Sequence, residues 1–371
     1  MPTKPKVSVV LITYNQQDYV GKTIESVLNQ SYQNFEIIIA DDSSTDETAK
    51  VIKSYKDKRI KYVKTDYNIG LNGNLNLAVS KASCDIVAWI DGGDILRKNY
   101  LERIVECFEK MSDIDVLHSG LCVIDKDDEY IKGQNEYFYY VPNRTNEENL
   151  YIAFMVSNIL QSPGMAMRKK VVETIFPLSY SFVNTQDYVM HIDILANDFK
   201  SYVLYDILVD YRVFNDGTNI SLNNSTAHRR EEAEIALLMD YFLKIKDIKL
   251  LKRVFKNEIQ STNLEPFDDT IPFFLGQMAL RSSHYHRQEW GYHTIMKFLS
   301  DKKNFDIVYK RYGFAFRDYL NVINHIKEIC AVKERNKYIK KYKKYKKYKN
   351  FFKASLTIII VEILIITFLV F

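Results

Sequence analysis

The stretch Ala88-Trp89-Ile90-Asp91-Gly92-Gly93-Asp94 decides the fold, because an apolar run ends abruptly in two acidic residues separated by two glycines. A second apolar run, Ile37-Ile38-Ile39-Ala40, ends in Asp41 and Asp42 about 50 residues earlier. Carboxylate oxygens at the end of a strand suit a divalent cation and a phosphorylated ligand. Ligands of open parallel sheets bind outside the carboxyl ends of the strands. The two acidic strand ends therefore predict one binding crevice.

Apolar runs and helical patterns alternate along the first 90 residues of the chain. Continuous apolar runs predict strands that are buried on both faces, and apolar residues at the helical period predict helices between them. Ser44-x-x-Glu47 also matches a capping box ahead of the second helix. Short links between such units indicate an α/β fold with a right-handed, doubly wound, mainly parallel sheet. The predicted strands are 7–12, 35–40, 60–63 and 86–90, and the predicted helices are 18–29, 48–55 and 71–82.

Length and composition bound the possible functions. The 371 residues, 47% apolar and 26% charged, suffice for a sizeable core and about two domains. Residues 333–353 hold eleven Lys or Arg and one Glu, a charge of +10, so the formal net charge of +4 leaves −6 for the rest of the chain. A mildly acidic body argues against nucleic acid as a partner. Widely spaced cysteines without a Cys-x-x-Cys pair predict reduced core thiols at Cys84, Cys107, Cys122 and Cys330.

The two ends of the chain differ in character. Residues 1–6 lead into the first strand without an apolar targeting region, so we expect the body in the cytoplasm. The Lys/Tyr-rich residues 340–349 precede residues 354–371, whose only charge is Glu362. A membrane span needs about 17 to 25 apolar residues, and basic residues beside it favour the anionic cytoplasmic leaflet. We expect a C-terminal apolar helix that anchors the chain, with a terminal amphipathic or buried helix as the alternative because a mid-span Glu is costly.

Helical spacing without β-type alternation characterises residues 224–330. This pattern predicts a helical appendage that links the α/β body to the membrane segment. We find no fixed repeat period in it, which disfavours a repeat array. The predicted helices are 231–242, 250–258, 271–282, 292–299 and 314–329.

Over about residues 6–222 the chain resembles the inverting family 2 glycosyltransferases of the bacterial surface-polysaccharide type, which have the GT-A fold. Six ordered motifs carry the resemblance, so coincidence is improbable. The motifs are the strand and turn 7–15 with the helix end 26–31, the acidic segment 41–46, the loop Asn68-Ile69-Gly70 followed by Asn76, the segment Asp91 to Asp94, Thr185-Gln186-Asp187-Tyr188, and Tyr211-Arg212 with Ser221.

The resemblance implies a nucleotide-sugar donor, with UDP as the favoured nucleotide. Asp42 would accept a hydrogen bond from the uracil ring, Asp91 would meet the ribose, and Arg212 would contact phosphate. The matching donor-binding positions are Thr13, Tyr14, Asn15, Asp42, Asn68, Asn76, Asp91, Arg212 and Ser221.

Inverting transfer also needs a base and charge neutralisation. One carboxylate must take a proton from the acceptor hydroxyl, and Asp187 is the candidate general base. Mn²⁺ or Mg²⁺ would neutralise the leaving diphosphate. Gly93 stands where the family usually has the metal-ligating Asp, so the metal would fall to Asp91 and Asp94 or be held more weakly.

Each acidic candidate has a structural alternative. Asp41 and Asp42 can serve as helix N-terminal anions, which the helix dipole favours. Asp94 can be the N-cap of a short turn, and Asp187 can be a helix-start carboxylate. His191, one turn beyond Asp187, is more often a packed polar residue than a ligand.

Departures from the family pattern leave two hypotheses from different classes. Ile12 replaces the usual Pro, Leu75 replaces an Arg, and Gln186 replaces the Glu before the base. Loss of the Arg makes Arg212 or Lys22 more important for phosphate. The chain is an active, membrane-anchored transferase or a catalytically weak relative that binds nucleotide-sugar or glycan in an assembly complex. A nicotinamide dehydrogenase is set aside because no Gly-x-Gly-x-x-Gly follows the first strand.

The expected organisation follows from these patterns. A GT-A domain would cover residues 1–222, a helical domain 223–332, a polybasic linker 333–353 and a membrane anchor 354–371. The partners would be a nucleotide-sugar donor, a glycan or lipid-linked acceptor, and the cytoplasmic face of a bacterial membrane. The sequence does not identify the sugar, the linkage or the oligomeric state.

Overall fold

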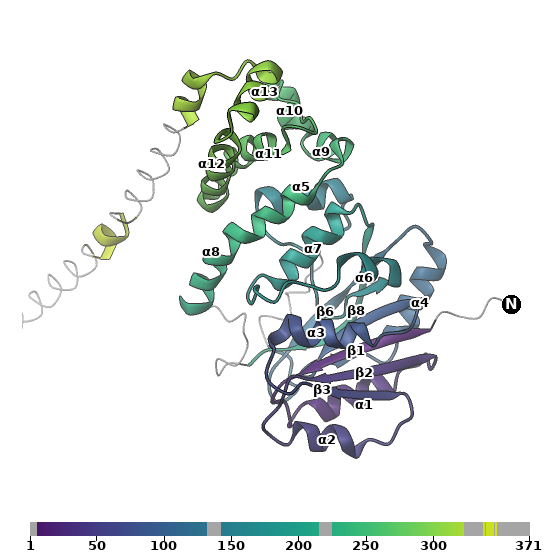
Figure 1. The fold of residues 1–371 in the computed structure, drawn as a ribbon. Coiled ribbons are helices and arrows are strands. Elements are labelled where there is room, and N and C mark those ends of the chain that lie inside the picture. Colours follow the sequence, from purple (N-terminus) through teal and green to yellow (C-terminus); the bar gives the residue numbers. More distant parts are fainter. Residues whose placement is uncertain are drawn as a thin grey trace, which may run out of the picture. The chain divides into compact units, whose positions relative to one another are not determined.

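The protein is represented by a computed structural model that describes residues 6–131, 142–214, 225–322, 337, 339–344 and 346 (Figure 1). The chain divides into two compact units, residues 1–291 and 292–371. The domain boundary predicted at residue 222 lies among residues 215–224, outside the described residues, and stays a prediction.

An eight-stranded sheet forms the centre of the first unit, in the order β3-β2-β1-β4-β7-β6-β8-β5. β1, β2, β3 and β4 are mutually parallel, as predicted, and β6 pairs parallel with β8. β7 runs antiparallel to both β4 and β6, and β5 runs antiparallel to β8. The sheet is therefore mixed, which corrects the prediction of a mainly parallel sheet beyond residue 91. The strands are β1 (Val7–Thr13), β2 (Phe35–Asp41), β3 (Ile60–Lys64), β4 (Ile86–Asp91), β5 (Ile95–Leu96), β6 (Val116–Ile124), β7 (Ala166–Arg168) and β8 (Ser201–Arg212).

Helices cover both faces of this sheet, which confirms the doubly wound α/β architecture. On one face Val9 and Leu11 share a core with α1, α2 and α4. On the other face Val10 and Ile12 share a core with α3, α6 and part of α7. Figure 1 shows α3 and α6 on the side of the strands opposite α1 and α2. The helices are α1 (Val20–Leu28), α2 (Thr48–Ser54), α3 (Gly70–Ser80), α4 (Tyr100–Lys110), α5 (Asn146–Met155), α6 (Lys169–Ile175) and α7 (Gln186–Ala196).

A second core, made only of helices, follows the sheet. Phe154 of α5 lies at its centre and meets Phe242, Phe255 and Trp290 edge to face, at ring-centroid distances of 4.9, 5.1 and 6.1 Å. This geometry suits the quadrupoles of aromatic rings. The core joins α5 and α7 to the helices that follow residue 225. These later elements are α8 (Ser225–Met239), η1 (Asp240–Lys244), α9 (Ile248–Val254), α10 (Lys256–Thr262), α11 (Ile271–Ala279) and α12 (Tyr285–Leu299). The second unit contains α13 (Lys302–Tyr312).

The predicted element bounds are confirmed for the first part of the chain, but one predicted capping motif is wrong. The first seven elements agree with their predicted ranges to within two residues. The capping box at Ser44 and Glu47 is wrong, because α2 has Glu47 as its N-cap without a side-chain cap and the Ser44 hydroxyl accepts from Asn15 N at 2.9 Å. α13 was not predicted. Cys84, Cys107 and Cys122 are buried and free, as expected, whereas Cys330 lies outside the described residues.

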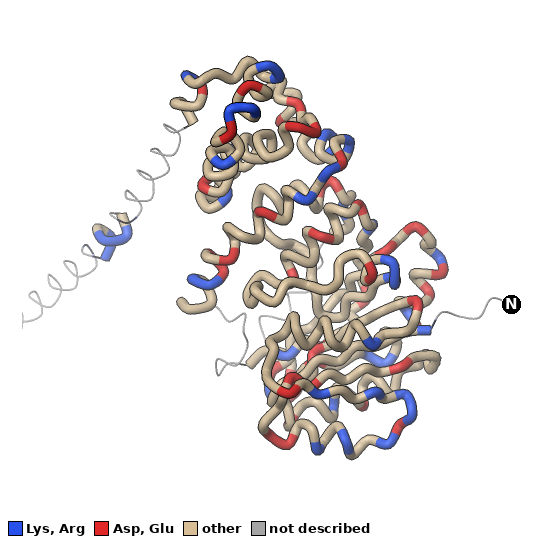
Figure 2. Tube along the Cα trace, in the orientation of Figure 1, with Lys and Arg blue, Asp and Glu red and all other residues tan. Residues whose placement is uncertain are grey.

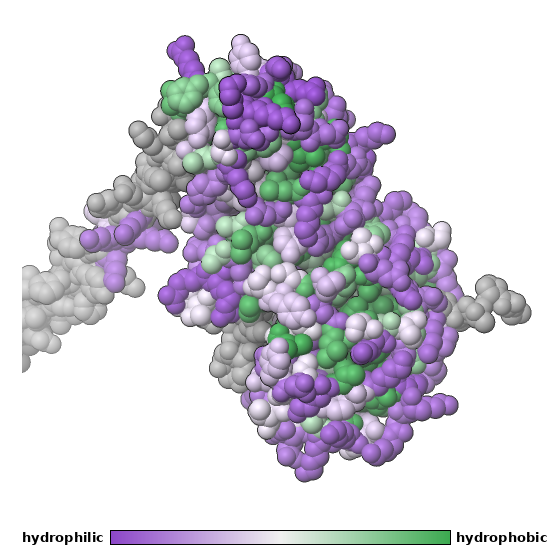
Figure 3. Space-filling model, in the orientation of Figure 1, coloured by the Kyte–Doolittle hydropathy of each residue, from purple (hydrophilic) through white to green (hydrophobic). Residues whose placement is uncertain are grey.

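The exterior of the described residues is mostly hydrophilic on the face drawn in Figure 3, with smaller apolar areas between. Among the described ranges, no helix combines the length and the apolar character that a bilayer crossing requires. The predicted apolar helix at residues 354–371 lies outside those ranges.

Candidate functional site at the carboxyl ends of the strands

The turn after β1 is tied to the loop after β2. Thr13 ends β1 almost fully buried, and Asn15 adopts φ +50, a left-handed conformation that Asn tolerates better than most residues. The Asn15 backbone N–H donates to Ser44 Oγ at 2.9 Å, and Asn15 Oδ1 accepts from Thr45 N at 2.8 Å. Asp42 N donates to the carbonyl of Thr13 at 2.9 Å. Two of the predicted nucleoside-binding segments therefore form one rigid edge.

Asp42 is held at the N-terminus of α3. Its two carboxylate oxygens accept from Ile69 N at 2.7 Å and Gly70 N at 2.9 Å. Asn68 Nδ2 approaches the Asp42 carbonyl at 3.4 Å. Backbone amides at a helix start stabilise a carboxylate. Asp42 therefore serves as a helix N-terminal anion, which is the structural alternative given for it in the sequence. The uracil contact of Asp42 and the donor role of Asn68 stay predictions.

The segment after β4 is a tight turn that carries Asp91 and Asp94. Gln16 Nε2 donates to Asp91 Oδ1 at 2.7 Å, and Thr13 Oγ1 donates to Gln16 Oε1 at 2.8 Å. Asp94 N donates to the Asp91 carbonyl at 3.0 Å. Burial raises the pKa of both carboxyls, and the negative charge of Asp91 raises that of Asp94 further. A divalent cation between the carboxylates would offset this repulsion.

Arg212, at the end of β8, reaches the same turn from the other side. Its backbone N–H donates to Asp94 Oδ1 at 2.9 Å, and its Nε donates to the Gly93 carbonyl at 2.7 Å. Its Nη2 binds Asp128, and its guanidinium lies 4.8 Å from the centre of the Tyr19 ring. The side chain is 1% exposed, so in this structure it holds the turn. Its phosphate contact stays a prediction, and Ser221 lies outside the described residues.

Gly92 and Gly93 have different surroundings. A Cβ on Gly92 would lie 2.5 Å from Gln16 Oε1 and 2.7 Å from Thr13 Oγ1, closer than real Cβ contacts. A Cβ on Gly93 would lie 3.3 Å from Gln16 Nε2, and its other neighbours are 3.7 Å away. The turn therefore requires glycine at 92, whereas a Cβ at position 93 would be close only to the end of the flexible Gln16 side chain.

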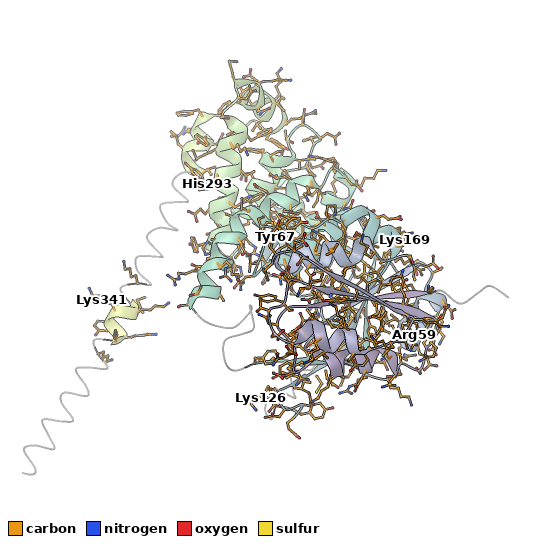
Figure 4. The ribbon with its side chains drawn as sticks, turned by 60° about the horizontal axis from the view of Figure 1, so that its bottom comes forward. Arg59, Tyr67, Lys126, Lys169, His293 and Lys341 are labelled. Atoms are coloured by element: carbon orange, nitrogen blue, oxygen red, sulfur yellow. The ribbon has the colours of Figure 1, made fainter. Side chains whose placement is uncertain are left out.

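Two exposed tyrosines stand beside this edge. Tyr14 follows β1 and is 46% exposed. Tyr67, labelled in Figure 4, lies between β3 and α3 and is 71% exposed. Exposed aromatic rings can stack on a base or a sugar. Tyr14 was predicted to line the nucleoside, but Tyr67 was not singled out because one exposed Tyr among 27 has no distinctive pattern.

The residues of α3 fix the loop that leads to α7. Asn76 Nδ2 donates to the Leu178 carbonyl and Asn76 Oδ1 accepts from Leu178 N, both at 2.8 Å. Asn72 Nδ2 donates to the carbonyl of Ser179 at 2.6 Å. Asn76 thus has a structural partner for both amide atoms, and its contact with the donor stays a prediction. Leu75, where the family often has an Arg, is buried in the core on that face of the sheet.

Asp187 lies in the first turn of α7. Its Oδ1 accepts from Tyr188 N at 2.8 Å and its Oδ2 accepts from Asn158 Nδ2 at 3.3 Å. Burial, with a smaller contribution from the charge of Glu231, raises the pKa of Asp187 to about 6. A carboxyl with this pKa is ionised at neutral pH and is more basic than an exposed one. Within the described residues, the hydrogen bonds of Asp187 do not connect it to Asp91 or Asp94.

Glu234 of α8 is a residue that the sequence pattern did not reveal. Its buried carboxylate accepts from the backbone amides of Val183, Asn184 and Thr185 at 2.9 to 3.3 Å, and from Thr185 Oγ1 at 2.9 Å. These bonds fix the chain just before Asp187. A helical Glu among many charged neighbours gives no sequence signal for such a role, since its partners lie about 50 residues away.

The mixed sheet, flanked by helices on both faces, is a GT-A-like α/β fold. Residues 8–176 match the family described as Glycosyl transferase family 2. A glycosyltransferase of Methanocaldococcus jannaschii, described as uncharacterized, is 30% identical over 222 residues, which are 59% of this chain and 74% of that protein. The chain belongs to glycosyl transferase family 2, and it is a glycosyltransferase with a nucleotide-sugar donor.

Two further proteins are similar to the chain. The Escherichia coli UDP-Glc:alpha-D-GlcNAc-diphosphoundecaprenol beta-1,3-glucosyltransferase WfgD is 27% identical over 194 residues, covering 52% of this chain and 70% of WfgD. The crystal structure of S. aureus TarS 1–349 in complex with UDP-GlcNAc is similar with a TM-score of 0.53 and 18% identity, covering 87% of this chain and 92% of TarS 1–349. The latter likeness shows a shared fold.

Replacing Gly92 by Ala should damage the site, because the new Cβ collides with Thr13 and Gln16 and breaks their link to Asp91. We expect a stability loss of about 1 to 3 kcal/mol, typical of overpacking, and weaker binding of nucleoside diphosphates. Thermal unfolding and calorimetric titration measure both effects. Gly93→Ala is the matched control and should change stability and affinity little; equal losses in the two variants would contradict this account of the turn.

Proposed function

We propose that this protein transfers a sugar with inversion from a UDP-sugar to a hydroxyl of a glycan or lipid-linked acceptor in the synthesis of a bacterial surface polysaccharide. The observation that carries the proposal is the carboxyl of Asp187, held at the start of α7 with a pKa raised to about 6. The similar protein WfgD, named for UDP-Glc and a diphosphoundecaprenol-linked acceptor, supports the donor and the acceptor class. The UDP-GlcNAc complex of TarS supports the nucleotide.

The proposed reaction is a single displacement. Asp187 takes the proton of the acceptor hydroxyl, whose oxygen attacks the anomeric carbon from the face opposite the nucleotide. A new glycosidic bond forms as the bond from that carbon to the phosphate oxygen breaks. The bonding electrons leave with the nucleoside diphosphate. Attack from the opposite face inverts the anomeric centre.

Asp91 and Asp94 fit a divalent metal of the type proposed, Mn²⁺ or Mg²⁺. Such ions are commonly held by one or two carboxylates together with phosphate oxygens. Each Oδ1 already accepts a hydrogen bond, while neither Oδ2 has a donor among the described residues. No group of three or more metal-ligating side chains occurs in the described ranges, so the substrate would have to complete the coordination. When bound, the ion would neutralise charge on the leaving diphosphate.

The donor and metal assignments can be tested together by calorimetric titration. UDP should bind more tightly than GDP, and Mn²⁺ should strengthen UDP binding in the wild type. Asp94→Asn should remove the gain due to Mn²⁺, because it neutralises one of the two carboxylates. Gly93→Asp should keep or increase that gain, since a Cβ at position 93 would be close only to the end of the flexible Gln16 side chain. Equal affinity for UDP and GDP would exclude the nucleotide assignment, and no response to Mn²⁺ in either the wild type or Gly93→Asp would exclude the metal pair.

The role of Asp187 predicts a specific kinetic defect. Asp187→Asn should bind UDP like the wild type but turn over about 10² to 10⁴ times more slowly, the usual contribution of general base catalysis. The base form exists above its pKa, so wild-type kcat should fall as the pH drops through about 6. Steady-state transfer assays from pH 5 to 8 measure both effects. Turnover at the wild-type rate in Asp187→Asn would exclude Asp187 as the base.

Gly93 favours a second candidate, a nucleotide-sugar or glycan-binding module of an assembly complex. Asp91 and Asp94 are separated by Gly92 and Gly93, so the turn has one carboxylate fewer than the family pattern. Donor binding without transfer or donor hydrolysis by the wild type, across a broad acceptor panel, would establish this alternative.

Membrane attachment at the cytoplasmic face is part of the same proposal and rests on residues 333–371. The described part of this segment, residues 339–344, is helical and exposed, and its lysines are blue in Figure 2. Lys341, labelled in Figure 4, is one of them. A lysine near an anionic surface contributes about 1 kcal/mol, so the +10 segment and the apolar residues 354–371 would act together.

Vesicle sedimentation tests the attachment. The full chain should bind anionic vesicles tightly, a chain lacking residues 354–371 should bind them only at low salt, and a chain ending at residue 330 should remain in solution and still bind UDP. A full-length protein that stays in solution with anionic vesicles at low salt would refute the membrane role.

A further inference from the structure

Hydrogen bonds run inward from Asp187 through the side chains of Asn158 and His191. Asn158 Nδ2 donates to Asp187 Oδ2 at 3.3 Å. Asn158 Oδ1 lies 2.9 Å from His191 Nδ1 and also accepts from Leu160 N at 3.3 Å. His191 Nε2 lies 3.4 Å from Ser162 Oγ. The carboxylate is therefore the outer end of a series of partly buried hydrogen bonds that leads to the buried His191.

The ionised carboxylate of Asp187 determines the direction of each hydrogen bond in this series. An ionised carboxylate only accepts, so Asn158 must present its NH₂ group to Asp187 and its oxygen to His191. His191 must then carry its proton on Nδ1, which leaves Nε2 to accept from the Ser162 hydroxyl. Only one tautomer of His191 and one orientation of the Asn158 amide satisfy all these atoms.

His191 is held neutral. It is 1% exposed, and burial together with neighbouring His118 lowers its pKa well below the usual value. The two rings meet edge to face with centroids 5.6 Å apart. His118, on β6, lies 2.6 Å through Nδ1 from the Gln161 carbonyl, and burial lowers its pKa to about 4. The charged group that faces Asp187 from α8 is Glu231, so neither histidine supplies a positive charge to the base at neutral pH.

We propose that Asn158 and His191 are positioning residues that hold the Asp187 carboxylate in the orientation needed to accept the acceptor proton. The proposal rests on the proposed function of Asp187. His191 locks the Asn158 amide, and the amide in turn restrains Asp187 Oδ2. Oδ1 is restrained separately by Tyr188 N. A catalytic group that is misplaced by about 1 Å can lose about 100-fold in rate, so a buried restraint of this kind affects turnover rather than donor binding.

The test uses substitutions of the full-length chain at position 191 that differ in one hydrogen bond. His191→Leu removes the donor to Asn158, whereas His191→Asn places an NH₂ group near the position of Nδ1. We expect kcat to fall about 10-fold to 100-fold in His191→Leu with little change in the donor KM, and to recover largely in His191→Asn. His191→Gln, whose amide reaches the Nε2 position instead, is a polar control and should stay impaired. If His191→Leu does not fold, His191→Gln can still be compared with His191→Asn.

Asn158→Leu gives a second readout, since loss of its donor disfavours the ionised carboxylate. The acid limb of the kcat profile should move to higher pH, and the Asp187 carboxyl, followed by ¹³C NMR against Asp187→Asn, should titrate at higher pH as well. In an Asp187→Asn background, His191→Leu should cost little further turnover, because both changes act through one group.

Unchanged kcat in both His191→Leu and His191→Gln, or equal losses in His191→Asn and His191→Leu, would overturn the proposal. So would an unchanged Asp187 titration in Asn158→Leu. If the wild type catalyses no transfer, the proposed function fails, and the NMR titration still decides whether Asn158 controls the Asp187 carboxyl.

Discussion

The hydrogen bond from the Gln16 amide to Asp91 joins the turn after β1 to the end of β4, and the geometry of the site depends on it. A parallel sheet brings its carboxyl ends to one edge, but it leaves them as separate loops. Gln16 links two of these loops because it accepts from Thr13 while it donates to Asp91. The backbone after Asp91 lies so close to the Gln16 side chain that a Cβ at position 92 would collide with it. Gly92 avoids this collision.

Carboxylates from distant elements position the two helices of the site. Asp42 binds the first amides of α3, and Glu234 binds the amides that precede α7. Asp42 accepts from N–H groups at the start of α3, and Glu234 accepts from N–H groups of the loop that leads into α7. Both place a negative charge near a helix N-terminus, which the helix dipole favours. α3 in turn holds the loop before α7 through Asn72 and Asn76. The position of Asp187 therefore depends on Asp42, which follows β2, and on residues of α3 and α8.

Environment gives chemically identical carboxylates different roles. Asp42 is satisfied by backbone amides, whereas Asp91 and Asp94 lie close enough to repel each other. Burial, with a smaller contribution from the charge of Glu231, raises the pKa of Asp187 to about 6. Carboxyls with such different partners can divide cation binding and base catalysis between them. The aspartates alone, without their partners, would not distinguish these roles.

The sequence by itself determined the alternation of strands and helices up to β4, because apolar periodicity is a local property of strands buried on both faces. It also predicted Asp91 and Asp94 as candidate ligands, since they follow a recognisable apolar run, whereas Thr13 was predicted from the family resemblance. The family resemblance, rather than periodicity, drew attention to Asp187.

Only the tertiary structure decided the partners of these residues. It showed that β7 is inserted antiparallel between β4 and β6, and that Arg212 donates to the Gly93 carbonyl. It also showed that Asn158 donates to Asp187. The predicted capping box does not form, because the Ser44 hydroxyl accepts from Asn15 instead. Most buried polar atoms need a hydrogen-bond partner. In the bonds named here, the donor and acceptor residues lie 29 to 119 positions apart in the sequence, too far for a local pattern to predict. Local patterns record the need for a hydrogen bond, and the packing of the whole chain determines which group provides it.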